Sequence, residues 1–223
     1  MRRLLPLQPL NSLTLLGFRH KLTEIGTPRP RAASTAALQL RSENMLRVDT
    51  SFLVIIDVQG KLAQLMHEKE ELFDGLQRII KGVQVLGIPI IWVEQNPEGL
   101  GPTVPEVARL LSDIKPISKF TFSCCRDGQF TSALASSNRR QALLVGIETH
   151  VCVYQTAVDL LEQGYEVQIV TDAVSSRTKH NMKIGLERMR EAGAGLTSTE
   201  TVLFELLRTA KADKFREIAQ IVK

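Results

Sequence analysis

Short apolar runs alternate with segments of helical periodicity along most of the chain. The apolar runs cover residues 52–56, 88–93, 142–147 and 165–170, and the helix-period segments cover about 68–86, 149–163 and 178–192. Short apolar runs are typical of strands buried on both faces, whereas the segments between them have the 3.6-residue period of amphipathic helices. This alternation predicts βαβ units and therefore a mainly parallel sheet.

Further short elements complete the predicted sheet. A strand is expected to end near Lys119, another to cover residues 195–197, and two C-terminal helices to lie near 200–210 and 213–221. These additions bring the count to about six strands. We therefore expect a doubly wound α/β fold with helices on both faces of the sheet, a Rossmann-like three-layer sandwich.

The composition is that of one ordinary globular domain preceded by a basic segment. Hydrophobic residues make up 43% of the chain and charged residues 23%. The net charge is +5 over residues 1–44 and −1 over residues 45–223. We expect the folded domain to cover 45–223, and residues 1–44 to be a disordered extension, a targeting segment or the consequence of a start upstream of Met45.

The N-terminal composition bears on the compartment. Residues 1–44 are rich in Arg, Ser and Thr and contain only two acids, as in a mitochondrial transit peptide if the source is eukaryotic. Pro6 and Pro9 interrupt the apolar stretch that a secretory signal needs. The chain has three cysteines, two of them adjacent, which is too few for a disulfide framework. We expect an intracellular protein, either cytoplasmic or mitochondrial.

The sequence does not indicate a membrane, a nucleic acid or a nucleotide cofactor as a partner. No run reaches about 18 apolar residues, so no membrane span is expected. The positive charge lies outside the domain, so no nucleic-acid partner is expected. Neither G-x-G-x-x-G nor a P-loop follows a predicted strand, so no nucleotide cofactor is expected. A small molecule remains as the expected substrate.

Cys152 lies where a thiol could be chemically useful. A buried strand ends at Gly146-Ile147, and a helix follows with Cys152 in its first turn. A helix start offers partial positive charge and unpaired N–H groups, which favour a thiolate and could hold an oxyanion. The alternative is an ordinary core cysteine, since cysteine is among the most buried residue types.

Asp57 and Lys119 lie at two other predicted strand ends. Ligands of open α/β sheets bind beyond the carboxyl ends of the strands, so these side chains could share a pocket with Cys152. Each alone is more often a helix cap or a surface charge. Their combination and order along the chain favour a site.

From about residue 48 to 223, the sequence resembles the isochorismatase-like superfamily of cysteine hydrolases. The resemblance rests on Ile55-Ile56-Asp57-Val58-Gln59, Ile117-Ser118-Lys119-Phe120, Gly146-Ile147-Glu148-Thr149-His150-Val151-Cys152-Val153 and Val170-Thr171-Asp172-Ala173. Within the superfamily it is most similar to the isochorismatase domain-containing proteins. The resemblance also implies a homo-oligomer, of no particular size.

The resemblance implies a role for each site residue. Cys152 would be the nucleophile, Asp57 the general base that takes its proton, and Lys119 the cation that stabilises the thiolate. A cis peptide would join Ile147 to Glu148, and the backbone N–H groups of Glu148 and Cys152 would form an oxyanion hole.

The charge of Lys119 is expected to matter more than the helix dipole. A free thiol has a pKa of about 8.5, and a helix start contributes about 0.3–1 kcal/mol, which is less than one pKa unit. An ammonium in a site of low dielectric contributes more. We therefore expect the pKa of Cys152 to lie below about 8.5.

Two departures from the superfamily narrow the expected chemistry. Its metal-dependent members carry histidines after the second strand, where this chain reads Trp92-Val93-Glu94-Gln95-Asn96-Pro97, so no metal and no cofactor is expected. Isochorismatases proper generally lack the nucleophilic cysteine. We therefore expect hydrolysis of a small amide or related carbonyl compound, at a C–N bond other than a peptide bond, through a covalent cysteine intermediate.

Two other functions stay open. The chain could be a catalytically idle member of the fold that acts as a binding or scaffolding protein. It could also be a redox protein that pairs Cys152 with Cys124 or Cys125, although we expect those two cysteines to be bystanders.

Overall fold

The computed structural model describes residues 45–223, and these belong to one compact unit. Expectations for residues 1–44 lie outside the described residues. The sheet has six strands in the order β3-β2-β1-β4-β5-β6, and every neighbouring pair is parallel. The strands are β1 (Ser51–Ile56), β2 (Ile90–Gln95), β3 (Ile117–Lys119), β4 (Gln141–Ile147), β5 (Glu166–Ser175) and β6 (Gly195–Thr197).

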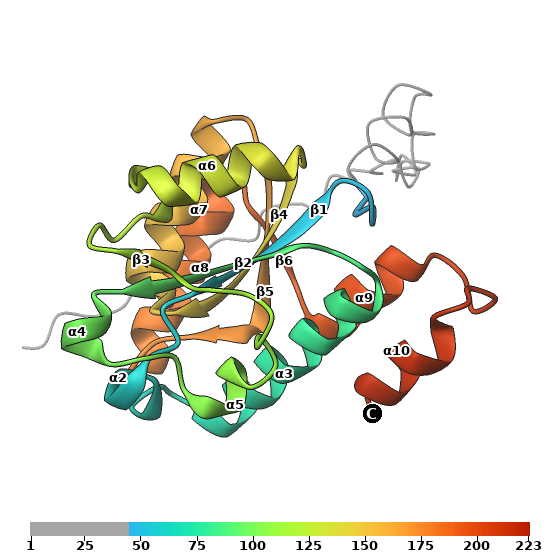
Figure 1. Ribbon diagram of the computed structural model, residues 1–223, viewed down its shortest axis with the longest axis horizontal. Helices are drawn as coiled ribbons and strands as arrows, with labels where there is room; N and C mark the ends of the chain where they lie inside the picture. Colours follow the sequence, from blue (N-terminus) through green and yellow to red (C-terminus); the bar gives the residue numbers. More distant parts are fainter. Residues whose placement is uncertain (1–44) are drawn as a thin grey trace, which may run out of the picture. The chain divides into compact units, whose positions relative to one another are not determined.

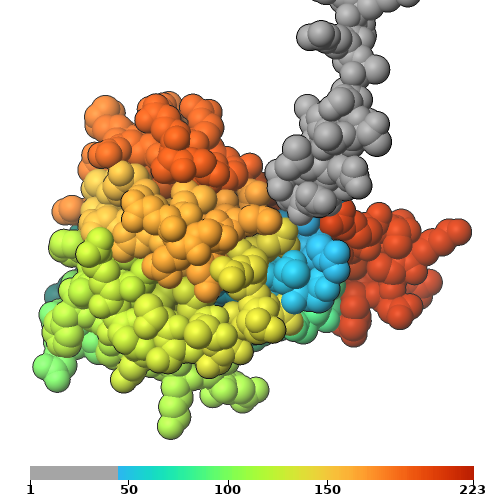
Figure 2. Space-filling model, turned by 90° about the horizontal axis from the view of Figure 1, so that it is seen from above, coloured from blue at the N-terminus to red at the C-terminus, as the bar shows by residue number. Residues whose placement is uncertain are grey.

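Helices cover both faces of this sheet (Figure 1). One face packs against α3 (Lys69–Val85), α5 (Pro105–Ala108), α9 (Thr199–Leu207) and α10 (Phe215–Ile221). The other face packs against α6 (Gly128–Ser137), α7 (Tyr154–Glu162) and α8 (Lys179–Glu191), which Figure 2 shows in yellow-green to orange. The short helices α2 (Gly60–Gln64) and α4 (Pro97–Leu100) follow β1 and β2. The predicted doubly wound α/β fold is confirmed.

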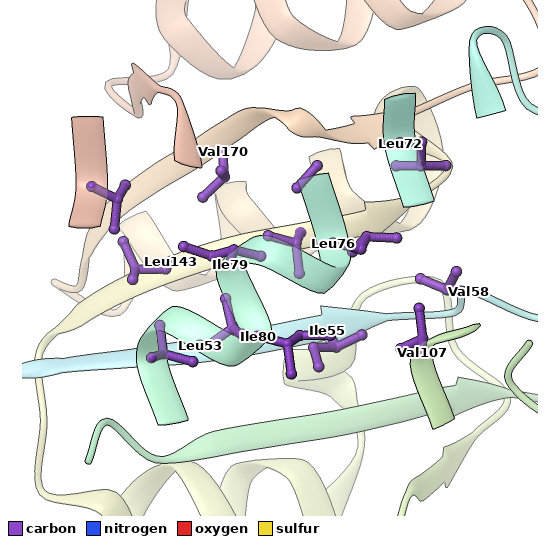
Figure 3. Packing of buried hydrophobic residues seen from close by; sticks show 14 of the residues in the cluster. Leu53, Ile55, Val58, Leu72, Leu76, Ile79, Ile80, Val107, Leu143 and Val170 are labelled. Atoms are coloured by element: carbon purple, nitrogen blue, oxygen red, sulfur yellow. The ribbon is translucent and has the colours of Figure 1, made fainter. Parts of the chain in front are cut away.

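Strand β1 shows why the apolar runs form the centre of the sheet. All six of its residues are buried. Leu53 and Ile55 point into the cluster under α3, whereas Phe52, Val54 and Ile56 point into the cluster on the other face. Figure 3 shows α3 side chains, Leu76 and Ile79 among them, over the side chains of β1 and β4. A continuous apolar run is therefore needed at this position, because both faces of the strand are covered.

Three local features differ from the sequence-based expectations. Helix α6 was not predicted, although Asp127 caps its start by accepting hydrogen bonds from the N–H groups of Gln129 and Phe130. Strand β5 continues to Ser175 through an irregularity around Asp172, where the apolar pattern breaks off. A five-residue π-helix, Thr149–Val153, replaces the expected first α-helical turn.

The strand order determines where a ligand site would lie. Strands β2 and β3 lie on one side of β1, whereas β4, β5 and β6 lie on its other side. The carboxyl ends of β1 and β4 therefore flank the point where the strand order reverses, which is the usual binding place in this architecture. None of the helices described over residues 45–223 is long and apolar enough to cross a membrane.

Candidate active site

The structure brings Asp57, Lys119 and Cys152 together at the carboxyl edge of the sheet. Asp57 follows β1, Lys119 is the last residue of β3, and Cys152 lies in the π-helix after β4. Lys119 is fully buried, and Asp57 and Cys152 are 2% and 7% exposed. The Lys119 Nζ donates to Asp57 Oδ2 at 2.8 Å. Charged side chains are rarely buried without a partner, and here the two charges are paired.

The turn after β4 depends on a glycine. Gly146 has a φ of +115°, and a Cβ there would lie 2.0 Å from the carbonyl oxygen of Ile56. Only glycine permits this conformation and this close approach of β4 to β1. The peptide bond between Ile147 and Glu148 is cis, as the resemblance implied.

Two glutamines that sequence reasoning missed hold the lysine in place. Gln95 Oε1 accepts a second hydrogen bond from Lys119 Nζ, also at 2.8 Å. Gln59 fixes the backbone of Gln95, because its Oε1 accepts from the Gln95 N–H at 2.6 Å and its Nε2 donates to the Gln95 carbonyl at 3.0 Å. Both glutamines lie at or just beyond strand ends, so the rule that identified Asp57 could have found them.

The ionisation of this cluster is dominated by burial. Burial raises the pKa of Asp57 above its ordinary value, although the charge of Lys119 and a hydrogen bond from it act in the opposite direction. The other carboxyl oxygen, Oδ1, has no hydrogen-bond partner among the described residues. Asp57 therefore has one oxygen held by the lysine and one oxygen available to take a proton.

The expectation that Cys152 has a lowered pKa is wrong. Burial raises the pKa of its thiol, the negative charge of Asp57 raises it further, and Lys119 lowers it only in part. The main cause is burial of the sulfur, and Lys119, which is paired with Asp57, offsets it only in part. The resting site therefore holds a neutral thiol beside an ion pair.

A small cavity opens beside the Cys152 thiol. Its volume is about 110 Å³, and it is lined by Asp57, Leu62, Gln95, Leu100, Phe122, Ile147, Glu148, Val151 and Cys152. The carboxylate of Glu148 accepts hydrogen bonds from the N–H and Nε of Arg177, at 3.0 and 3.2 Å. The cavity thus combines the predicted nucleophile and base with walls that are mostly apolar.

The other two cysteines lie in different surroundings. Cys124 is fully buried, which raises the pKa of its thiol to about 12. Burial also raises the pKa of the partly buried Cys125, to about 11. Neither residue lines the cavity, and all three described cysteines are free thiols.

Strand β2 uses the polar side chains near its end within the protein. Glu94 accepts hydrogen bonds from the N–H and hydroxyl of Thr103, both at 2.7 Å, and Trp92 donates to the same hydroxyl. Over residues 45–223, no three His, Cys, Asp or Glu side chains are grouped in a way that could hold a metal ion.

The sheet order and the buried cluster at its edge define a class: three-layer α/β proteins with a cysteine site at the switch point. The isochorismatase domain matches residues 51–201. The chain is 38% identical to isochorismatase domain-containing protein 2 of Xenopus laevis, over 82% of this chain and 88% of the relative. The chain belongs to the isochorismatase family, and this membership suggests a hydrolase.

Solved structures have the same fold. A MAR1 ribonuclease from Caenorhabditis elegans is 36% identical, with a TM-score of 0.75 over 80% of this chain and 92% of that chain. The YcaC gene product of Escherichia coli, described as an octameric hydrolase of unknown specificity, is 24% identical, with a TM-score of 0.76 over 79% and 88%. At 24% identity, the similarity to the YcaC structure shows the fold alone.

Proposed function

We propose that this protein is a cysteine hydrolase that cleaves the C–N bond of a small amide or related carbonyl compound. The observation that carries the proposal is the position of Cys152. Its thiol lines a small cavity together with Asp57, whose Oδ1 is unpartnered among residues 45–223 and whose Oδ2 is bound to Lys119. A nucleophile, a base and a group that orients the base are the parts needed for covalent catalysis.

In the first half of the reaction, Cys152 attacks the substrate carbonyl. The sulfur forms a bond to the carbonyl carbon, the thiol proton passes to Asp57 Oδ1, and negative charge develops on the carbonyl oxygen. The backbone N–H groups of Glu148 and Cys152 are the proposed donors to this oxygen. The C–N bond then breaks, Asp57 returns the proton to the leaving nitrogen, and a thioester on Cys152 remains.

In the second half, water hydrolyses the thioester. Asp57 accepts a proton from the attacking water, and the oxyanion forms again in the same place. The C–S bond then breaks, the sulfur recovers its proton from Asp57, and the carboxylic acid leaves. The overall change is amide plus water to acid plus amine, and the enzyme returns to its starting state.

The raised pKa of Asp57 is useful in this cycle. A base whose pKa is raised toward the operating pH both accepts and returns protons more readily than an ordinary aspartate does. Lys119 keeps the carboxylate oriented and limits how far burial raises the pKa of Asp57. General-base catalysis of this kind contributes about 10²–10⁴-fold to the rate.

The names of the relatives suggest other activities, which the site supports less well. A ribonuclease needs groups that bind phosphates, but residues 45–223 have a net charge of −1, and no described lysine or arginine lines the cavity. Isochorismate is a vinyl ether, for which a nucleophilic cysteine has no evident use. An idle binding protein would not need an Asp-Lys pair beside a thiol.

We also propose that the protein assembles with copies of itself. The support is the Escherichia coli structure of the same fold, whose description names an octamer. Light scattering of the purified protein measures the assembly size directly, and a strictly monomeric protein would contradict this proposal.

Turnover with a panel of small amides tests the proposed function. We expect the wild type to release ammonia or amine, the Cys152→Ala variant to release none, and the Cys125→Ala control to match the wild type. Cys125 lies outside the cavity, so its loss should not affect the chemistry. If Cys152→Ala keeps its activity, or if the wild type hydrolyses no member of the panel, the proposal is wrong.

A further inference from the structure

The walls of the cavity beside Cys152 are apolar on most sides. Leu62, Leu100, Phe122, Ile147 and Val151 provide the apolar surface. The polar members of the lining are Cys152 itself, Asp57, Gln95 and Glu148. A bound substrate would therefore meet polar groups near the sulfur and apolar side chains elsewhere.

The charges around the cavity are unbalanced on its inner surface. Two acidic residues, Asp57 and Glu148, belong to the lining, whereas their cationic partners Lys119 and Arg177 do not. Lys119 is fully buried behind the site and already donates to Asp57 and Gln95. Among the described residues, no lysine or arginine is left at the cavity wall to pair with an anionic substrate.

The volume limits the part of the substrate that can be enclosed. The cavity of about 110 Å³ is well below the roughly 300–1,000 Å³ of pockets that enclose drug-sized ligands. It therefore suits a carbonyl group with a short chain. Phe122 is 56% exposed and lies in the lining, so it borders the way in.

We infer that the site selects electrically neutral carbonyl compounds with a short, apolar acyl group and rejects those whose acyl group carries a carboxylate. The hydrolysis of such compounds rests on the function proposed above, whereas the selection by charge and size is a property of the cavity. An anionic acyl group would displace water next to Asp57 and Glu148 and would gain no cation in return.

The first experiment measures charge selection without turnover. Iodoacetamide and iodoacetate have nearly the same size but differ in charge, and each alkylates thiols. Cys125 in the same protein is an internal control, because it lies outside the cavity. We expect the ratio of the iodoacetamide rate to the iodoacetate rate to be about tenfold larger at Cys152 than at Cys125, since like charges repel strongly in a poorly hydrated site. Equal ratios at the two cysteines would overturn the inference.

A matched pair of variants tests the cause of the selection. Leu62→Lys adds a cation to the cavity wall, and Leu62→Met changes the same side chain without adding charge. The Lys variant should lose most of the preference for iodoacetamide at Cys152, whereas the Met variant should keep it. If both variants, folded by circular dichroism, behave alike, the charge of the wall is not the determinant.

The second experiment measures size and charge selection in turnover. Acetamide, propionamide and butyramide should be hydrolysed, hexanamide much more slowly, and succinamate not detectably. Equal turnover of succinamate and butyramide would contradict the inference and leave the proposed hydrolase standing. If alkylation of Cys152 is selective but no amide is hydrolysed, the cavity selects by charge as inferred and the hydrolase proposal fails.

Discussion

The two carboxyl oxygens of Asp57 have different surroundings, and this difference is central to the site. One oxygen accepts from Lys119, and the other has no hydrogen-bond partner among the described residues. The sequence could place Asp57, Lys119 and Cys152 at strand ends, because apolar runs reveal where strands stop. It could not give the sign of the thiol pKa shift, because that depends on how deeply the sulfur is buried and on which group Lys119 is bonded to.

The substitution Asp57→Asn should separate the ionisation of Cys152 from its activity. The negative charge of Asp57 raises the pKa of Cys152, so the thiol pKa should fall in the variant. Turnover should nevertheless fall by about 10²–10⁴-fold, because the general base is lost. The ultraviolet absorbance of the thiolate measures the pKa, and Cys152→Ala identifies the contribution of the other two cysteines. A thiol pKa that rises or stays constant in Asp57→Asn would contradict the arrangement of charges described here.

The pH dependence of kcat/KM should report the raised pKa of Asp57. The proposed base acts only when ionised, so activity should rise with pH through the pKa of Asp57 in the free enzyme. Burial raises this pKa, and activity should therefore be lost on acidification at a pH above the ordinary aspartate value of about 3.9. A pH–rate profile checks the position of this limb, and full activity down to pH values near 3.9 would contradict it.

At the scale of elements, the apolar pattern predicted the positions of the strands along the chain better than the details of their ends. The apolar runs of β1 and β4 can be recognised in the sequence because both faces of these strands are covered. The sequence does not predict the continuation of β5, because Asp172 interrupts the apolar run. In the structure, Asp172 accepts hydrogen bonds from Thr199 at the start of α9. That contact joins segments far apart in the chain, so no local pattern shows it.

Two glycine substitutions test how closely α3 approaches the sheet. A Cβ at Gly75 would lie 2.1 Å from the backbone oxygen of Asp172, so Gly75→Ala should destabilise the protein by about 1–3 kcal/mol through overpacking. Gly128, at the start of α6, has no atom within 4 Å of such a Cβ. Gly128→Ala should therefore be neutral or stabilising by up to about 1 kcal/mol. Urea unfolding of the two variants measures both effects, and equal stabilities would contradict the close contact between α3 and β5.

At the scale of the whole molecule, the described part of the chain begins with residues that belong to the fold. Leu46 is 1% exposed, its N–H donates to Glu205 at 2.8 Å, and its carbonyl accepts from Arg208 at 2.6 Å. The carbonyl of Met45 accepts from Gln141 at 3.1 Å. These contacts tie the start of the described chain to α9 and β4, so the folded domain should start close to Met45.

Two truncations test this boundary. Residues 45–223 should fold with the melting temperature of the full chain, in agreement with the proposal that the domain covers this range. Residues 49–223 lack Leu46, whose removal from the core costs about 2–5 kcal/mol, and should melt at least roughly 4 °C lower. Thermal melting followed by circular dichroism distinguishes the two. A large loss of melting temperature in 45–223 would mean that the fold needs the preceding residues.

The proposed mechanism depends most on Cys152 as the residue that becomes covalently attached to the substrate. Rapid acid quenching during turnover of propionamide, followed by peptide mass mapping, tests this point directly. We expect a propionyl group on the peptide that contains Cys152, and none on the peptide that contains Cys124 and Cys125. Turnover with no acyl group on Cys152, or with the acyl group on another residue, would contradict the account.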